Sequence, residues 1–151
     1  MLAAGINPLL QGLNYIPKWF LYESDIESFT IPNHIKSIRT AAFNWCQNLT
    51  NIEIPANTKS IGSYAFNGCT SLKSVTIPDS VTSMGERTFS GCISLTKIII
   101  GANVTSIGKS MFVYCNSLTD VIVGNNVTDI GYYAFAGCGK LTEIKINQTI
   151  Q

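Results

Sequence analysis

The sequence has few of the features that usually identify enzymes, nucleic-acid-binding proteins or membrane proteins. Only 13% of its 151 residues are charged, and ten basic and nine acidic side chains leave a formal net charge of +1. Because neither sign forms a run, charge predicts no nucleic-acid partner and no anionic membrane surface. Gly5, Pro8 and Gly12 interrupt the mildly apolar N-terminal segment, which therefore predicts no membrane insertion and shows no signal peptide.

The sequence also lacks a set of residues that would carry out chemistry. Its single histidine, His34, is not accompanied by a nucleophile motif, a phosphate-binding loop or a zinc-protease motif. The five cysteines are each separated by 23 residues, whereas zinc sites use close pairs such as C-x-x-C. We therefore expect no enzyme activity, no catalytic residues, no cofactor and no bound metal.

What the sequence does contain is a repeat of 23 residues. Five positions of the repeat are apolar in each of five copies. They are Ile38, Ile61, Met84, Ile107, Ile130; Phe43, Phe66, Phe89, Phe112, Phe135; Cys46, Cys69, Cys92, Cys115, Cys138; Leu49, Leu72, Leu95, Leu118, Leu141; and the alternating pairs Ile52/Ile54, Val75/Ile77, Ile98/Ile100, Val121/Val123, Ile144/Ile146. A fixed period of this length predicts a solenoid, because one unit cannot bury its apolar face alone.

Each unit combines two local patterns. Residues 49–54 alternate apolar and polar side chains, which indicates a half-buried strand, and stacked units would align these strands in a parallel sheet. Phe66 and Cys69 lie three residues apart, which suggests one helical turn that Gly68 could end with positive φ. The sequence thus predicts an α/β-type repeat solenoid with parallel strands on one face, and short helical turns and short extended segments on the other.

The cysteine positions leave two alternatives open. Neighbouring strands of a parallel sheet lie ~4.8 Å apart, so the distance between units permits disulfides. The number of cysteines is odd, however, and cysteine commonly packs as a small apolar side chain. We expect a ladder of buried, reduced thiols.

The repeat register divides the chain into two parts. Upstream of the five copies, Phe20 falls at the phenylalanine position and Glu23 at the cysteine position, among extra aromatic residues. Residues 1–34 are therefore predicted to be an N-terminal capping segment with a degenerate repeat. Residues 35–151 are predicted to form five solenoid units with no evident C-terminal cap.

The pattern L-x-x-[IV]-x-[IV]-x-x-[NST], as in residues 95–103, resembles the leucine-rich repeat signature. Its last position, called here the asparagine position, carries Asn57, Ser80, Asn103, Asn126 and Thr149. With "SIGSYAFNGCTSL" and "TIPDSV", residues 26–151 resemble the BspA-like leucine-rich repeat family, although the proline after the strand is lost in the later units. The resemblance implies a curved solenoid and an extracellular or cell-surface role in binding or adhesion.

Alternation along the strands identifies an outward face that could recognise a partner. Its predicted binding residues are Glu53, Thr76, Lys97, Ile99, Asp120, Ile122, Glu143 and Lys145. Ile99 and Ile122 form an apolar patch, although β-branched residues also favour strands for structural reasons alone. A third outward position is predicted at Pro55, Pro78, Gly101, Gly124 and Asn147, and Lys97 is expected to pair with Asp120.

Two functions remain in competition. The first is a non-catalytic binding or adhesion module that recognises a protein or surface glycan through the strand face. The second is a structural or self-associating fragment, because the C-terminal unit leaves a parallel strand edge without a neighbour, and open edges recruit further strands.

Overall fold

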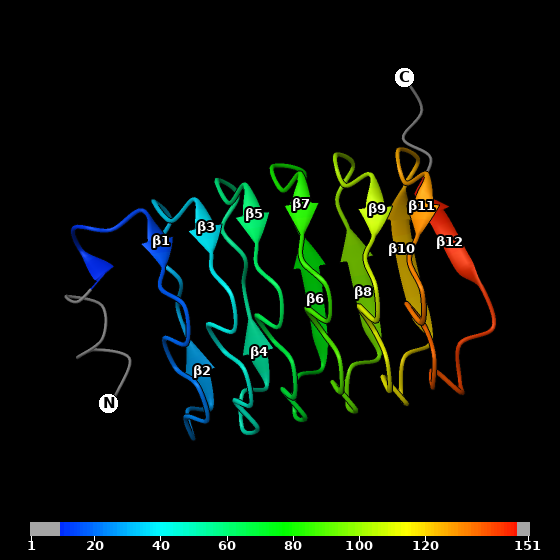
Figure 1. The fold of residues 1–151 in the computed structure, drawn as a ribbon, viewed down its shortest axis with the longest axis horizontal. Coiled ribbons are helices and arrows are strands. Elements are labelled where there is room, and N and C mark those ends of the chain that lie inside the picture. Colours follow the sequence, from blue (N-terminus) through cyan, green and yellow to red (C-terminus); the bar gives the residue numbers. More distant parts are fainter. Residues whose placement is uncertain (1–9, 148–151) are drawn as a thin grey trace.

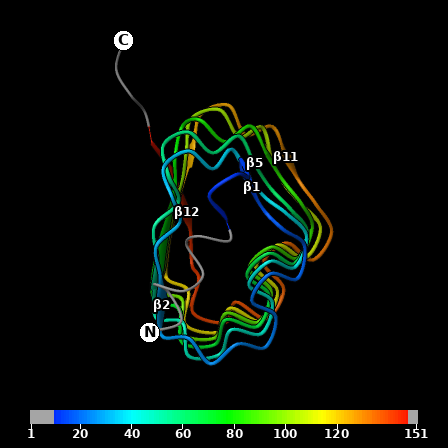
Figure 2. The same cartoon turned by 90° about the vertical axis from the view of Figure 1, so that its left-hand side faces the viewer.

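The computed structural model describes residues 10–147, which form a solenoid of six rungs. We use "rung" for one circuit of the chain, and the rungs stack along the long axis of the molecule (Figure 1). Viewed along that axis, they superpose as an elongated ring with strands on two of its sides (Figure 2). Residues 1–9 and 148–151 of the two predicted domains, with Thr149 of the asparagine position, lie outside the described residues.

Each rung contributes one strand to each side of the ring. The short-strand face consists of β1 (Tyr15–Ile16), β3 (Ser37–Ile38), β5 (Ser60–Ile61), β7 (Ser83–Met84), β9 (Ser106–Ile107) and β11 (Asp129–Ile130). The long-strand face consists of β2 (Ser28–Phe29), β4 (Asn51–Ile52), β6 (Ser74–Ile77), β8 (Lys97–Ile100), β10 (Asp120–Gly124) and β12 (Ile144–Asn147). The rungs are therefore numbered one to six by these strand pairs.

All strand pairs are parallel, and their register follows the repeat. The long-strand face contains the sheets β2-β4 and β6-β8-β10-β12, and the short-strand face contains β1-β3-β5-β7 and β9-β11. Ile61, for example, lies between Ile38 and Met84, its equivalents in the neighbouring rungs. The predicted parallel solenoid is thus confirmed, but both sides of the ring carry strands.

The predicted apolar positions form one continuous core between the two faces. The phenylalanine, cysteine and leucine positions all belong to the same buried cluster. The rings of Phe43, Phe66, Phe89, Phe112 and Phe135 stack nearly parallel, with centroids 5.3–5.7 Å apart. Each rung therefore buries its neighbour's side chains with copies of its own.

The helical turns predicted between the short strand and the cysteine, and with them the α/β class, are wrong. This segment is a run of tight turns. The Phe43 N–H donates to Ala65 O on the next rung at 2.8 Å, whereas the Asn44 N–H donates to Ala41 O at 3.1 Å. A helix requires consecutive N–H groups to bond four residues back within their own segment. Stacking uses every second donor for the next rung, and no helix can form.

Positive φ angles recur at two positions of this turn segment. Gly68, Gly91 and Gly137 have φ of +74°, +71° and +78°, so the predicted role of glycine at this position is confirmed. Trp45 and Tyr114 occupy the same position in rungs two and five with φ of 64° and 62°. The backbone conformation is thus kept even where the residue is aromatic.

The first rung departs from the period of 23. Tyr15 pairs with Ser37, an offset of 22 residues, whereas Ser28 pairs with Asn51, an offset of 23. The second rung therefore contains one residue more than the first between these two pairs. The phenylalanine and cysteine positions of the first rung shift accordingly.

Two predicted equivalences in the first rung are corrected by this shift. Leu21, not Phe20, takes the phenylalanine position, because its carbonyl oxygen accepts a hydrogen bond from the Cys46 thiol at 3.0 Å, as phenylalanine carbonyls do in later rungs. Ser24, rather than Glu23, takes the cysteine position: its N–H donates to Leu21 O at 2.9 Å, the bond that cysteine makes elsewhere. A single-residue difference was invisible to an alignment at constant offset.

Candidate functional site

The predicted binding residues all lie on or beside the long-strand face. Thr76 is in β6, Lys97 and Ile99 are in β8, Asp120 and Ile122 are in β10, Lys145 is in β12, and Glu53 and Glu143 lie immediately outside β4 and β12. Strand alternation buries Ile98 and Val121 and turns their neighbours outward. The parity of the strands was therefore predicted correctly.

The register places four of these residues in one row across the sheet. Thr76 pairs with Ile99, Ile99 with Ile122, and Ile122 with Lys145. Lys97 and Asp120 pair in the adjacent row. The two isoleucines, which we call the isoleucine patch, therefore lie at the centre of a polar strand face and are half-buried there.

The ion pair on this face differs from the predicted one. Lys145 Nζ lies 3.6 Å from Asp120 Oδ1, whereas Lys97 was expected to be the partner. Lysine is long enough to reach diagonally across the row, and Lys145 does so past Ile122. Because both side chains are about half exposed, at 55% and 46%, the pair contributes little to stability. It does border the isoleucine patch.

The third outward position is also corrected. Pro55, Gly101 and Gly124 are buried, because the chain turns at the end of each long strand and the next rung packs against it. A Cβ atom on Gly101 would lie 2.6 Å from the Pro78 carbonyl carbon, and one on Gly124 would lie 2.8 Å from a neighbouring backbone atom. The outward face therefore has two residues per rung rather than three.

Two shallow hollows adjoin the candidate site. One, of about 370 Å³, includes Glu53 and Thr76 in its lining. The other, of about 280 Å³, includes Thr76 and Ile99, with Asn147 at its far side. These hollows bring three of the predicted residues to concave surface that a partner could fill.

The cysteine ladder is buried and reduced, as expected. The thiols of Cys69, Cys92, Cys115 and Cys138 each donate to a phenylalanine carbonyl oxygen of the preceding rung at 3.1–3.2 Å. Burial, which disfavours the thiolate, raises the pKa of Cys46 and Cys115 to about 12 and that of Cys92 well above its usual value. A neutral buried thiol is neither a nucleophile nor a metal ligand.

The asparagine position fastens the turn at the end of each long strand. Asn103 and Asn126 donate from Nδ2 to Asp79 O and Ala102 O, both at 2.7 Å, and His34 Nε2 lies 3.4 Å from Leu10 O. The histidine thus makes the structural contact expected of this position. Within residues 10–147, no three His, Cys, Asp or Glu side chains gather into a metal-binding cluster, and no helix is long and apolar enough to cross a membrane.

Sequence reasoning missed a second surface on which aromatic side chains are exposed. Trp19, Tyr22, Trp45, Tyr114, Tyr132 and Tyr133 are 42–82% exposed, and all lie on the turn segments. The indole of Trp45 lies over Gly68, and the ring of Tyr114 lies over Gly137. The available signal was an aromatic residue at a position where other repeats have glycine.

Comparison with known proteins agrees with this architecture. The sequence model of the BspA-type leucine-rich repeat region matches residues 7–49 and 36–151, with six copies. No functionally curated protein matches the chain.

Two crystal structures illustrate the similarity. The leucine-rich repeat protein TpLRR of T. pallidum is 32% identical with a TM-score of 0.73, over 76% of this chain and 56% of that one. A leucine-rich cell surface protein of Faecalibacterium prausnitzii is 33% identical with a TM-score of 0.77, over 82% of this chain and 33% of that one. The chain thus spans about half or less of the length of these relatives. The repeat, the rung structure and these matches together show that the chain belongs to the BspA-type leucine-rich repeat family.

Proposed function

We propose that the chain is a non-catalytic binding or adhesion module at a cell surface, and that it recognises a protein or surface glycan through its long-strand face. The family and its cell-surface relative support the general role. The observation that carries the finer proposal is the isoleucine patch, which pairs two half-buried apolar side chains across β8 and β10 on an otherwise polar face.

The surroundings of the patch fit a recognition surface. Lys97, Asp120 and Lys145 lie around it, and Thr76 extends its row. An apolar centre with a polar, solvent-accessible border is the usual composition of a protein-binding site. Energetically important contacts also tend to concentrate at such a centre, where a partner excludes water.

The test is the double variant Ile99→Asp with Ile122→Asp, assayed for binding to a panel of extracellular-matrix proteins and to a glycan array. Because charge replaces the apolar centre, we expect affinity for any bound partner to fall by tenfold or more, or about 1.4 kcal/mol. Ile93→Asp is the matched control, since Ile93 is 45% exposed on the turn segment instead.

A second double variant separates folding from binding. Ile99→Thr with Ile122→Thr keeps the β-branched shape that strands prefer and removes only part of the apolar surface. It should unfold at nearly the wild-type denaturant concentration and bind more weakly. Wild-type affinity in both double variants would exclude this face.

End-to-end self-association is the second candidate function. Ile130 and Ile146 of the sixth rung are 57% and 58% exposed, and among the described residues β12 has a strand neighbour only on its β10 side. Such an edge can accept a strand from a second copy. Light scattering across a range of protein concentrations tests this, and Ile146→Asp should abolish any oligomer. A wild-type protein that remains monomeric at high concentration would contradict it.

A further inference from the structure

Charge is separated between the two faces of the first three rungs. Lys18, Lys36, Arg39 and Lys59 are all exposed on or beside the short-strand face. The short-strand segments of these rungs, residues 14–19, 35–41 and 58–64, contain no Asp or Glu. The intervening segments 20–34 and 42–57 contain four acidic residues and no Lys or Arg. A nearly neutral chain thus presents a cationic surface on one side only.

These cations are not neutralised within the molecule. The ion pair found in residues 10–147 is Lys145–Asp120, at the other end of the solenoid. The Arg39 guanidinium carbon lies 3.4 Å from the centre of the Tyr15 ring, and this contact holds the side chain over the first two rungs. Arg39 is therefore positioned in advance and keeps donors that no carboxylate occupies.

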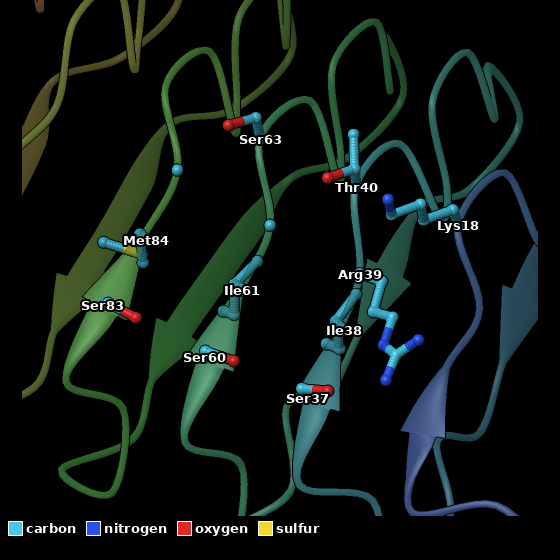
Figure 3. Close-up of a pocket in the computed structure, with 12 residues that line it drawn as sticks. Lys18, Ser37, Ile38, Arg39, Thr40, Ser60, Ile61, Ser63, Ser83 and Met84 are labelled. Atoms are coloured by element: carbon cyan, nitrogen blue, oxygen red, sulfur yellow. The ribbon is translucent and has the colours of Figure 1, made fainter.

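The cations adjoin a groove of about 450 Å³ on the short-strand face. We call it the cationic groove; its lining includes Lys18, Arg39, Ser37, Ser60 and Ser83. Figure 3 shows the three serine hydroxyls following one another along successive rungs and pointing the same way, with Lys18 and Arg39 at one end.

Glycine keeps the floor of the cationic groove low. Gly62 and Gly85 line it, and a Cβ atom on Gly62 would lie 2.5 Å from the Thr40 backbone nitrogen. Larger residues are excluded because the neighbouring backbone is so close. The result is a trough that runs along the solenoid, with hydroxyl groups on its floor and cations at its N-terminal end.

The spacing of the groups favours one class of ligand. Successive serines are one rung apart, ~4.8 Å, which is close to the length of one sugar unit in an extended chain. An extended peptide advances only ~3.3–3.4 Å per residue and would fall out of step with the rungs. Guanidinium and ammonium groups match carboxylates, and serine hydroxyls both donate to and accept from sugar hydroxyls.

We propose that the cationic groove binds an acidic polysaccharide, whose chain runs along the solenoid axis. Carboxylates of the sugars pair with Lys18, Arg39 and the flanking Lys36 and Lys59, and sugar hydroxyls bond to the serine row. The site is limited to the N-terminal half, because threonine replaces lysine at position 82 and Glu86 follows in the fourth rung. It is separate from the isoleucine patch and lies on the other side of the ring.

The probe is a polygalacturonate oligosaccharide, titrated calorimetrically into the full chain at low and at moderate salt. We expect binding that weakens with salt, little binding of neutral dextran, and weaker binding of poly-L-glutamate of matched charge. Equal affinity for poly-L-glutamate would overturn the proposal, because it would show attraction to charge without recognition of sugar. Absence of polygalacturonate binding at low salt would also overturn it.

Matched variants locate the site. Lys36→Gln with Lys59→Gln should weaken polygalacturonate binding about tenfold, and Ser60→Ala should weaken it less. Lys73→Gln with Lys140→Gln removes the same charge from exposed positions elsewhere and should leave affinity within about twofold of wild type. Equal losses in the two lysine pairs would overturn the assignment to the groove. The Ile99→Asp with Ile122→Asp variant should retain polygalacturonate binding, which separates this proposal from the preceding one.

Discussion

The first and last rungs of the solenoid carry the same apolar pattern but differ in exposure to solvent. Ile16 and Ile31 of the first rung are 0% and 4% exposed, whereas their equivalents Ile130 and Ile146 in the sixth are 57% and 58% exposed. Identical residue types at identical repeat positions are therefore buried at one end and exposed at the other. What differs is the neighbour, not the residue.

The first rung is covered by the segment that leads into it. Leu10 is fully buried, and in the end-on view the dark-blue segment before β1 lies inside the outline of the rungs (Figure 2). Three contacts join this segment to the stack or to itself: Leu13 N–H to Leu10 O at 3.0 Å, Lys36 N–H to Asn14 O at 2.6 Å, and His34 Nε2 near Leu10 O. We propose that residues 10–34 act as the N-terminal cap that the irregular first repeat predicts.

The largest expected effect is a difference between matched core substitutions at the two ends. Ile16→Ala should lower the free energy of unfolding by about 2–5 kcal/mol, because it opens a cavity in a covered rung. Ile130→Ala should cost only about 0.5 kcal/mol, because its side chain is already exposed. Urea denaturation of both variants measures the difference. Equal losses would show that the sixth rung is covered in solution, and would break the comparison.

Thiol reactivity should show the same asymmetry. Cys138 is 9% exposed, whereas the other four cysteines are fully buried. The pKa of every thiol is raised by burial, so alkylation of the native protein should be slow and should accelerate as pH rises toward that pKa. We expect Cys138 to react about tenfold faster than Cys46, as measured by mass spectrometry of peptides. Urea-unfolded protein, in which all five should react alike, is the control.

The smallest expected effect lies between the two ends, and it is a gain. The Ser80 hydroxyl occupies the asparagine position, is buried, and has no hydrogen-bond partner among the described residues. An asparagine there should reach the turn carbonyl of the preceding rung, as Asn103 and Asn126 do. We expect Ser80→Asn to raise the free energy of unfolding by about 1 kcal/mol. Ser80→Ala, which removes the hydroxyl without adding a donor, is the comparison, and a lower stability for Ser80→Asn than for Ser80→Ala would contradict this account.

Much of the fold was predictable because repetition makes each rung's neighbour a copy of itself. The inward positions, the parallel register of the long strands and the buried cysteine ladder all follow from apolar residues that recur every 23 positions. The identity of the outward residues on β6, β8 and β10 follows from alternation in the same way. These are local patterns whose environment is set by the period.

Other features depended on contacts that no local pattern encodes. The shift to Leu21 and Ser24 in the first rung arises from a one-residue difference in circuit length. The pairing of Asp120 with Lys145 depends on the reach of a side chain across a neighbouring strand. The cationic groove combines residues from rungs one to four, which lie far apart in the sequence.

The sequence alone determined that the chain stacks and which side chains face the core, since burial of apolar residues repeats with the chain. Only the tertiary structure decided that the turn segments are not helical, because their N–H groups bond alternately within the rung and to the next one. It also decided which ends and faces remain exposed, because exposure depends on what packs against a residue and not on the residue itself.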